Sequence, residues 1–220
     1  MSNSLIPCIY VLKDRYIMGG YTTNGSRLWK SFLNGDLKAW EQIFKLFYKD
    51  LYGYGIKLSS RSELTKDCIH ELFVVLWDRR EHLGEVESIK AYLLASLRRS
   101  LLKKIQQKRT RHVQWEEQIH GAVELQFSAE EVIIEDEIEA SKRNALYHAL
   151  DSLPDRQKEV LYLKYFNGMS YDEIEEILSI NYQSIRNHIH RAVKKLRESM
   201  DDHISEIAIS LILFLVLLPV

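Results

Sequence analysis

Proline, cysteine and glycine are scarce in this chain, and each scarcity excludes a class of protein. With 3 prolines and 9 glycines in 220 residues, there are too few turn residues for a sandwich or barrel of many short strands, and long helices are favoured. The 2 cysteines, Cys8 and Cys68, cannot form a disulfide framework or a C-x-x-C metal site. A reducing cytoplasm is therefore the expected location. The apolar segment 5–12 lacks the basic start of a signal peptide.

Sequence motifs of enzymes and metal sites are also missing. The chain contains no P-loop, nucleophile elbow, zinc motif or dinucleotide fingerprint. His188 and His190 stand two positions apart, which on a helix points them about 200° away from each other. They cannot share an ion, so we expect no metal, no cofactor and no catalytic residue. A hydrophobic content of 46% also excludes intrinsic disorder.

What the chain does have is strong local segregation of charge, hidden behind a formal net charge of -1. Residues 98–111 hold seven basic side chains and no acid, and residues 112–140 hold nine acids and no Lys or Arg. Residues 183–197 hold five basic side chains. Two basic segments separated by an acidic connector suit a protein that holds a polyanion at two places.

Apolar periodicity predicts helices in both halves of the chain. Between residues 28 and 111, an apolar stripe recurs at helical spacing at Leu64, Cys68, Leu72, Val75 and Leu76. Gly53 and Gly55 lie inside a predicted helix, where a kink is expected. No alternating strand and helix pattern is present, so a parallel α/β domain is not predicted.

The C-terminal third carries helix start and stop signals in close succession. Asn167-Gly168 suits a left-handed helix end, and Ser170 with Glu173 forms a capping box that opens a short helix. Asn181 can cap the next helix, which runs to about Ser199. That helix places apolar residues on one face and Gln183, Asn187, His190, Arg191 and Lys194 on the other. A short helix, a tight turn and a basic-faced helix form a helix-turn-helix.

Three ordered segments resemble the extracytoplasmic-function sigma factors of bacterial RNA polymerase. They are the region 4 segment 153–198, the region 2 helix DCIHELFVVLW at 67–77, and the following helix AYLLASLRRSLLKKIQQKR at 91–109. The segment NYQSIRNHIHRA is most similar to sequences of the iron-transport-regulator-like branch of Bacteroidetes. Glu175 and Ser179 stand where the family has a small residue and a turn glycine, which leaves the geometry of the turn open.

The resemblance implies a non-enzymatic subunit that gives the polymerase its promoter specificity. Its partners would be core RNA polymerase, through the beta-prime clamp and the beta flap, and promoter DNA. The clamp-binding residues implied are Asp67, His70 and Glu71. The residues implied at the minus-ten element are Tyr92, Arg98, Lys103 and Lys108, because melted DNA needs an aromatic surface and cations on its backbone.

In the second module, the resemblance implies binding to the minus-thirty-five element. Gln183, Ser184 and Asn187 lie early on the recognition helix, where side chains reach base edges in the major groove. Arg191 and Lys194 lie later on the same face and are expected to neutralise phosphate. The rival interpretation is a freestanding helix-turn-helix regulator. An anchoring or adaptor protein is suggested only by the apolar C-terminus.

The expected architecture is all-α, with two helical modules that make few mutual contacts. We expect an irregular N-terminal segment at 1–25, region 2 at 26–111, an acidic linker at 112–140, region 4 at 141–203 and an apolar tail at 204–220. The linker is expected either to enter the RNA exit path or to act as a flexible tether.

The tail has an apolar run of 14 residues, 207–220. As a helix it would reach about 21 Å, short of the ~30 Å hydrocarbon core of a bilayer. Three alternatives stay open for it: burial against an antisigma factor or the module's own surface, weak membrane association, and self-association.

Overall fold

The computed structural model describes residues 21–110 and 147–199, and side chains within 25–107 and 147–198. These residues form helices and no strand, which confirms the predicted all-α class. The acidic linker 112–140, the tail 204–220 and residues 1–20 of the N-terminal segment lie outside the described residues. Within the part described, no helix is long and apolar enough to cross a membrane.

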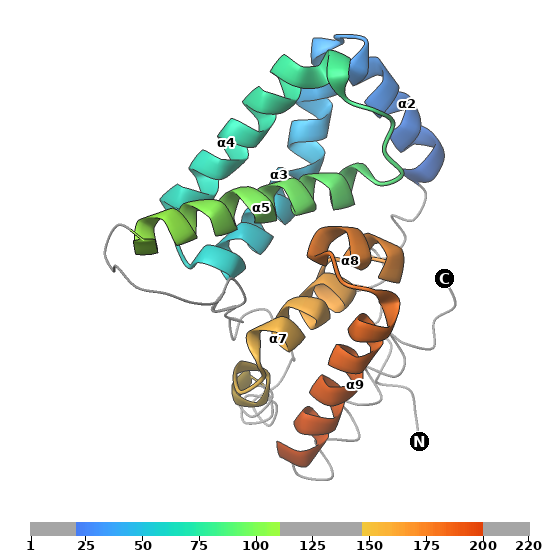
Figure 1. Cartoon of the computed structure of the whole chain (residues 1–220). Helices are drawn as coiled ribbons and strands as arrows, with labels where there is room; N and C mark the ends of the chain where they lie inside the picture. The colour runs from blue at the N-terminus through green and yellow to red at the C-terminus, as the bar shows by residue number, and fades with distance from the viewer. Residues whose placement is uncertain (1–20, 111–146, 200–220) are drawn as a thin grey trace, which may run out of the picture.

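The first module contains four α-helices and one short 3-10 turn (Figure 1). In chain order these are α2 (Tyr21–Leu33), α3 (Leu37–Ser59), α4 (Ser62–Arg79), η2 (Arg80–His82) and α5 (Ile89–Thr110). Helix α3 packs against α2, α4 and α5, and α4 packs against α5. The side chain of Asp36 caps α3 by accepting a hydrogen bond from the Lys38 amide at 2.9 Å.

Helix α2 begins at Tyr21, inside the segment expected to be irregular. Packing explains the difference: Trp29 and Phe32 are almost fully buried, and the Trp29 indole donates a hydrogen bond to the Gly84 carbonyl at 2.9 Å. Tertiary contacts of this kind override the weak helix propensity of Asn24 and Gly25.

Helix α3 is a single helix through both of its glycines, so the expected kink is replaced by close packing. A Cβ atom on Gly55 would lie 2.5 Å from the Cγ2 atom of Thr65 on α4. A Cβ atom on Gly53 would lie 3.3 Å from the Tyr162 hydroxyl of the second module. Gly55 therefore lets α4 approach α3 more closely than a side chain would allow, whereas a Cβ atom on Gly53 would require the Tyr162 hydroxyl to move by a few tenths of an ångström.

The apolar stripe predicted on α4 is correct for most of its length and wrong at one position. Leu64, Cys68 and Leu76 are buried, whereas Val75 is 48% exposed. The buried face instead includes Ile69 and Phe73, because α4 packs against both α3 and α5. Its core face is therefore wider than one line of side chains.

The second module contains α7 (Asp155–Leu161), a π-helical turn η4 (Tyr162–Phe166), α8 (Tyr171–Leu178) and α9 (Tyr182–Ser199). Helix α9 packs against α7 and α8. Its apolar face is confirmed, because Ile185, Ile189, Ala192 and Leu196 are all buried. This is the predicted helix-turn-helix arrangement.

The predicted helix boundaries in this module are confirmed. Gly168 has a φ of +66°, and the Ser170–Glu173 capping box makes both of its hydrogen bonds. The side chain of Asn181 accepts a hydrogen bond from the Ser184 amide at 2.8 Å. Ser179, at the turn between α8 and α9, has a φ of 53°, so the turn keeps the left-handed conformation that glycine more usually adopts.

The two modules are docked on each other, which makes the expectation of few mutual contacts wrong. Helix α8 lies directly against α5 (Figure 1), and one set of buried residues continues from the first module into the second. The physical reason is a buried ionic network between α3, α5 and α7. Sequence periodicity carries no sign of it, because its members lie far apart in the chain.

Candidate nucleic-acid and polymerase interfaces

The residues predicted to bind the polymerase clamp lie together on the exposed side of α4. Asp67, His70 and Glu71 are all exposed, as their positions around the helix require. The Glu71 carboxylate accepts a hydrogen bond from Lys104 of α5 at 2.6 Å, and this bond raises the pKa of Lys104. The charge of Asp67 acts on Lys104 in the same direction, and His70 is exposed on the same helix.

An apolar groove continues this face toward the C-terminal end of α4. It has a volume of about 290 Å³ and is lined by Leu37, Trp40, Val74, Trp77 and Asp78. Leu37 is 61% exposed and Val74 is 57% exposed, so the groove presents apolar side chains to a partner. Sequence reasoning missed the groove, although Val74 follows Asp67 by seven positions and so had to share its face.

The residues predicted for the minus-ten element differ in how accessible they are. Lys103 is exposed on α5, where it can reach a phosphate. Tyr92 is half-buried and packs edge-to-face on Trp29, with 5.6 Å between ring centroids. Lys108 belongs to α5, but its side chain lies outside the described residues.

Arg98, the fourth predicted minus-ten residue, is held by the second module. Its Nε atom donates to the Oε1 atom of Glu159 on α7 at 2.8 Å, and its Nη2 atom lies 3.4 Å from the Oε2 atom. The exposed fractions of the Arg98 and Glu159 side chains are 15% and 4%. A guanidinium that meets both oxygens of one carboxylate forms a charge-assisted pair with a defined geometry.

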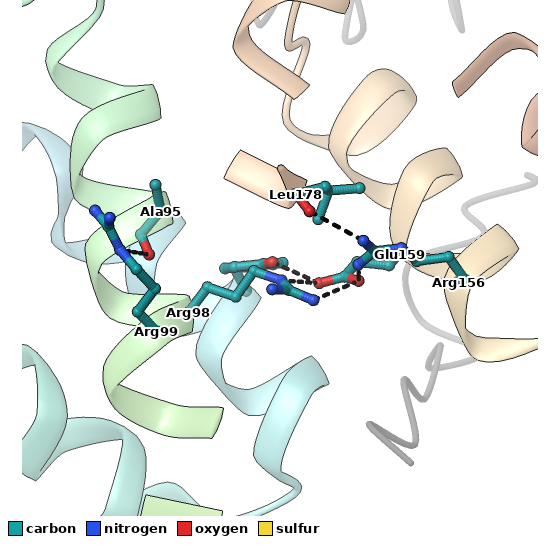
Figure 2. A network of polar contacts seen from close by, with 7 residues as sticks. Ala95, Arg98, Arg99, Arg156, Glu159 and Leu178 are labelled. Carbon is teal, nitrogen blue, oxygen red and sulfur yellow. Dashed lines mark hydrogen bonds and ion pairs between the residues drawn. The ribbon is translucent and has the colours of Figure 1, made fainter. Parts of the chain in front are cut away.

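Glu159 is the centre of a larger network that joins four helices, α3, α5, α7 and α8 (Figure 2). The Tyr54 hydroxyl of α3 donates to its Oε1 atom at 2.7 Å, and Arg156 donates to its Oε2 atom at 3.0 Å. Arg156 also donates to the carbonyl of Leu178 at the end of α8. Figure 2 shows Arg98 and Arg156 reaching Glu159 from opposite sides.

This network determines the charge state of Glu159. Burial alone would raise the pKa of Glu159, but the charge and hydrogen bond of Arg98, together with the charge of Arg156, bring it below its ordinary value. Burial and the neighbouring Glu159 charge raise the pKa of Tyr54 well above its ordinary value. At neutral pH the site therefore holds a carboxylate, two guanidinium groups and a neutral phenol.

The residues predicted to contact the minus-thirty-five element lie on the outer face of α9. Gln183, Asn187, Arg191 and Lys194 are exposed, and Ser184 is half-buried. The Gln183 amide donates to the Asn187 side chain at 3.2 Å, so the two amides form one hydrogen-bonding surface. Lys194 lies 3.8 Å from Glu198, an exposed pair that water and salt screen strongly.

An aromatic cluster at the start of α9 was missed by sequence reasoning. Tyr182 is 46% exposed, and its ring lies 5.0 Å from that of Tyr171 on α8. The guanidinium of Arg186 lies over the Tyr182 ring at 5.9 Å. An exposed tyrosine directly before Gln183 was the available signal, and it adds an apolar contact surface beside the predicted base-reading residues.

Comparisons with known proteins agree with this arrangement. Residues 143–196 match the family described as Sigma-70, region 4. The ECF RNA polymerase sigma factor SigK of Mycobacterium ulcerans (strain Agy99) is 20% identical over 183 residues, covering 83% of this chain and 96% of the relative. The ECF RNA polymerase sigma factor SigW of Bacillus subtilis (strain 168) is 22% identical over 178 residues, covering 79% of this chain and 95% of the relative.

Two solved structures share the fold. CnrH in complex with the cytosolic domain of CnrY is 16% identical, with a TM-score of 0.53 over 78% of this chain and 93% of that chain. The sigma factor RpoE in complex with the anti-sigma factor NepR from Bartonella quintana is 23% identical, with a TM-score of 0.52 over 74% of this chain and 97% of that chain.

These matches extend over both helical modules and favour promoter-directed transcription initiation over a freestanding helix-turn-helix regulator. The region 4 match covers residues 143–196, and the ECF RNA polymerase sigma factors align along nearly their whole length, so the chain is similar to this family over both modules.

Proposed function

We propose that this chain is an alternative sigma factor that binds core RNA polymerase and directs it to promoters with a minus-ten and a minus-thirty-five element. The observation that carries the proposal is the presence of two separate exposed faces on one chain. One is the face of α4 with its apolar groove, and the other is the polar and basic face of α9. A freestanding regulator has no use for the first.

The α4 face fits a protein partner rather than DNA. Asp67 and Glu71 would repel phosphate, whereas an apolar groove with a polar margin is the usual composition of a protein interface. We assign Asp67, His70 and Glu71 to the beta-prime clamp, and we extend this surface to the groove formed by Leu37 and Val74. The beta flap would contact the second module.

The α9 face fits the major groove of DNA. The paired amides of Gln183 and Asn187 can hydrogen-bond base edges, and amides are the groups that read adenine most specifically. Arg191 and Lys194 follow along the same face and would contact phosphate. Tyr92, Lys103, Lys108 and, once released from Glu159, Arg98 would serve the minus-ten element.

The proposal also includes the branch of the family to which the chain belongs and the partner that regulates it. The motif NYQSIRNHIHRA supports the iron-transport-regulator-like branch of Bacteroidetes. An antisigma factor or another regulatory protein is proposed as a partner, since RpoE, a sigma factor of the same fold, is bound to the anti-sigma factor NepR, and CnrH is bound to the cytosolic domain of CnrY. The site of action would be the cytoplasm, where the polymerase works, with membrane association through the tail as the alternative.

Binding to core polymerase in the absence of DNA is the decisive test. Asp67→Asn and Glu71→Gln should each weaken core binding by about 1.5 kcal/mol or more, because each removes a charged hydrogen-bond acceptor. Glu85→Gln is the matched control: it makes the same charge change at an exposed ion pair with Lys30, away from α4. Run-off transcription from genomic fragments then identifies the promoters.

A chain that binds no bacterial core polymerase, or that binds it equally well with and without these carboxylates, would contradict the proposal. DNA binding without core binding would favour the freestanding regulator.

A further inference from the structure

We infer that the contact between Glu159 and Arg98 is an intramolecular latch: the second module occupies a cation of the minus-ten surface, so the chain must open before it can bind a promoter. The inference rests on the proposed function, because it concerns how the two DNA-binding faces of a sigma factor become available. It adds a state in which one face blocks the other.

The contact between Arg98 and Glu159 resembles the contact that an arginine makes with a DNA phosphate. Arg98 points the edge of its guanidinium at two oxygens of one anion, and a DNA phosphate would offer two oxygens in the same way. Only one of the two anions can occupy the site. While Glu159 holds Arg98 with 4% of its own side chain exposed, no phosphate can reach this cation.

The spacing of promoter elements requires the contact to break. Elements centred at minus ten and minus thirty-five are about 25 base pairs apart, or about 85 Å along B-form DNA. Helix α9 has 18 residues and is about 27 Å long, and it packs on the same α7 that carries Glu159. In the docked state its reading face therefore lies within a few tens of ångströms of Arg98, too close to contact both elements.

The rest of the interface combines buried apolar side chains with polar and aromatic contacts. Lys90 of α5 donates to the Asn167 carbonyl at 2.9 Å, and Tyr54 stacks on Tyr162 with 6.2 Å between centroids. Gly53 leaves room for the Tyr162 hydroxyl. Ions in a buried pair regain their hydration when they separate, which offsets much of the attraction that is lost. An interface centred on such a pair can open without unfolding either module.

The experiment uses the full chain and two variants that open the latch by different means. Glu159→Gln removes the anion and keeps its size. Gly53→Leu places a side chain where the Tyr162 hydroxyl lies, with no change of charge and with a residue that favours helix. Glu41→Gln is the control, an equal charge change at an exposed ion pair on α3.

Small-angle scattering should show a larger radius of gyration for both variants than for the wild type and Glu41→Gln. Binding to oligo(dT) should tighten, and its dependence on log salt should become steeper by about 0.7, the contribution of one added phosphate contact on a single strand. If Glu159→Gln fails to fold, Gly53→Leu decides the result. Because Gly53→Leu leaves the net charge unchanged, tighter DNA binding by this variant comes from the release of Arg98 and not from the loss of an acidic side chain.

Wild-type dimensions and an unchanged salt slope for folded Gly53→Leu would overturn the latch, with core binding by the wild type left intact. Failure of the proposed function is a different result, in which no form of the chain, including the wild type, binds core polymerase.

Discussion

The exposed side chains of α9 change in character along the helix, and this change separates two kinds of DNA contact. Gln183 and Asn187 are neutral amides held to each other, whereas Arg191 and Lys194 are cations without a buried partner. Amides distinguish bases through directed hydrogen bonds, and cations respond to any phosphate. The two pairs should therefore respond differently to DNA sequence and to salt.

Arg191→Ala and Lys194→Ala should weaken binding of the holoenzyme to cognate and scrambled upstream elements alike, and each should lower the salt slope by about 1. Gln183→Ala and Asn187→Ala should cost about 1–3 kcal/mol on the cognate element only. Salt titrations of promoter binding on both DNAs measure the difference. If all four variants behave alike on scrambled DNA, α9 does not enter the groove with this face.

Among the helices, α3 has the role of a central support, and its glycines determine how closely the others approach. Gly55 faces Thr65 of α4, whose hydroxyl lies 2.9 Å from that of Ser59. The backbone contact at Gly55 is tighter than any side chain permits, because a Cβ atom there would overlap the Thr65 methyl group. The angle between α3 and α4, which presents the clamp-binding face, depends on this contact.

Gly55→Ala should lower the free energy of unfolding by up to about 2 kcal/mol, since an overpacking cost of about 1–3 kcal/mol is offset by the ~1 kcal/mol gained in helix propensity. Adding Thr65→Ser removes the overlapping methyl group and keeps the hydroxyl, so it should restore part of the loss. Urea unfolding of the single and double variants measures the coupling. Strictly additive effects would show that the two positions do not compete for this space.

Local signals made the second module predictable in detail. The Ser170–Glu173 box, Asn181 and Gly168 each act within a few residues of their own position, so a pattern in the sequence was sufficient to place α8 and α9. The contacts of Arg98 with Glu159 and of Tyr54 with Glu159 span 61 and 105 positions. Nothing in the neighbourhood of any of these residues indicates the pairing, and the charge of Arg98 alone predicted a phosphate partner.

For the whole molecule, docking of the modules joins their stability to the ionisation of Glu159. Its pKa lies below the ordinary value of 4.5 in the folded chain. A carboxyl of this kind stabilises the fold fully above its unfolded pKa and loses that contribution as the pH falls through the folded value. The groups that face it are Arg98, Arg156 and Tyr54, and only the carboxyl changes charge in acid.

Wild-type chain should therefore stay compact from neutral pH down to about pH 4.5 and expand only below it, as followed by small-angle scattering. Glu159→Gln should be expanded throughout, and Glu41→Gln should follow the wild type. Expansion of the wild type between pH 7 and pH 5 would mean that a different group, with a higher pKa, controls docking.

The placement of Arg98 and Glu159 on one chain has a consequence for how the protein responds to its own abundance. A separate inhibitor releases its target on dilution, and its effect depends on the ratio of the two proteins. Two groups on the same chain meet at an effective concentration that is fixed by the connecting segment. Each molecule is then held closed to the same extent whether the cell contains a few copies of the chain or many. The fraction of open molecules is set by surfaces that compete for this contact, and not by the number of copies of the chain.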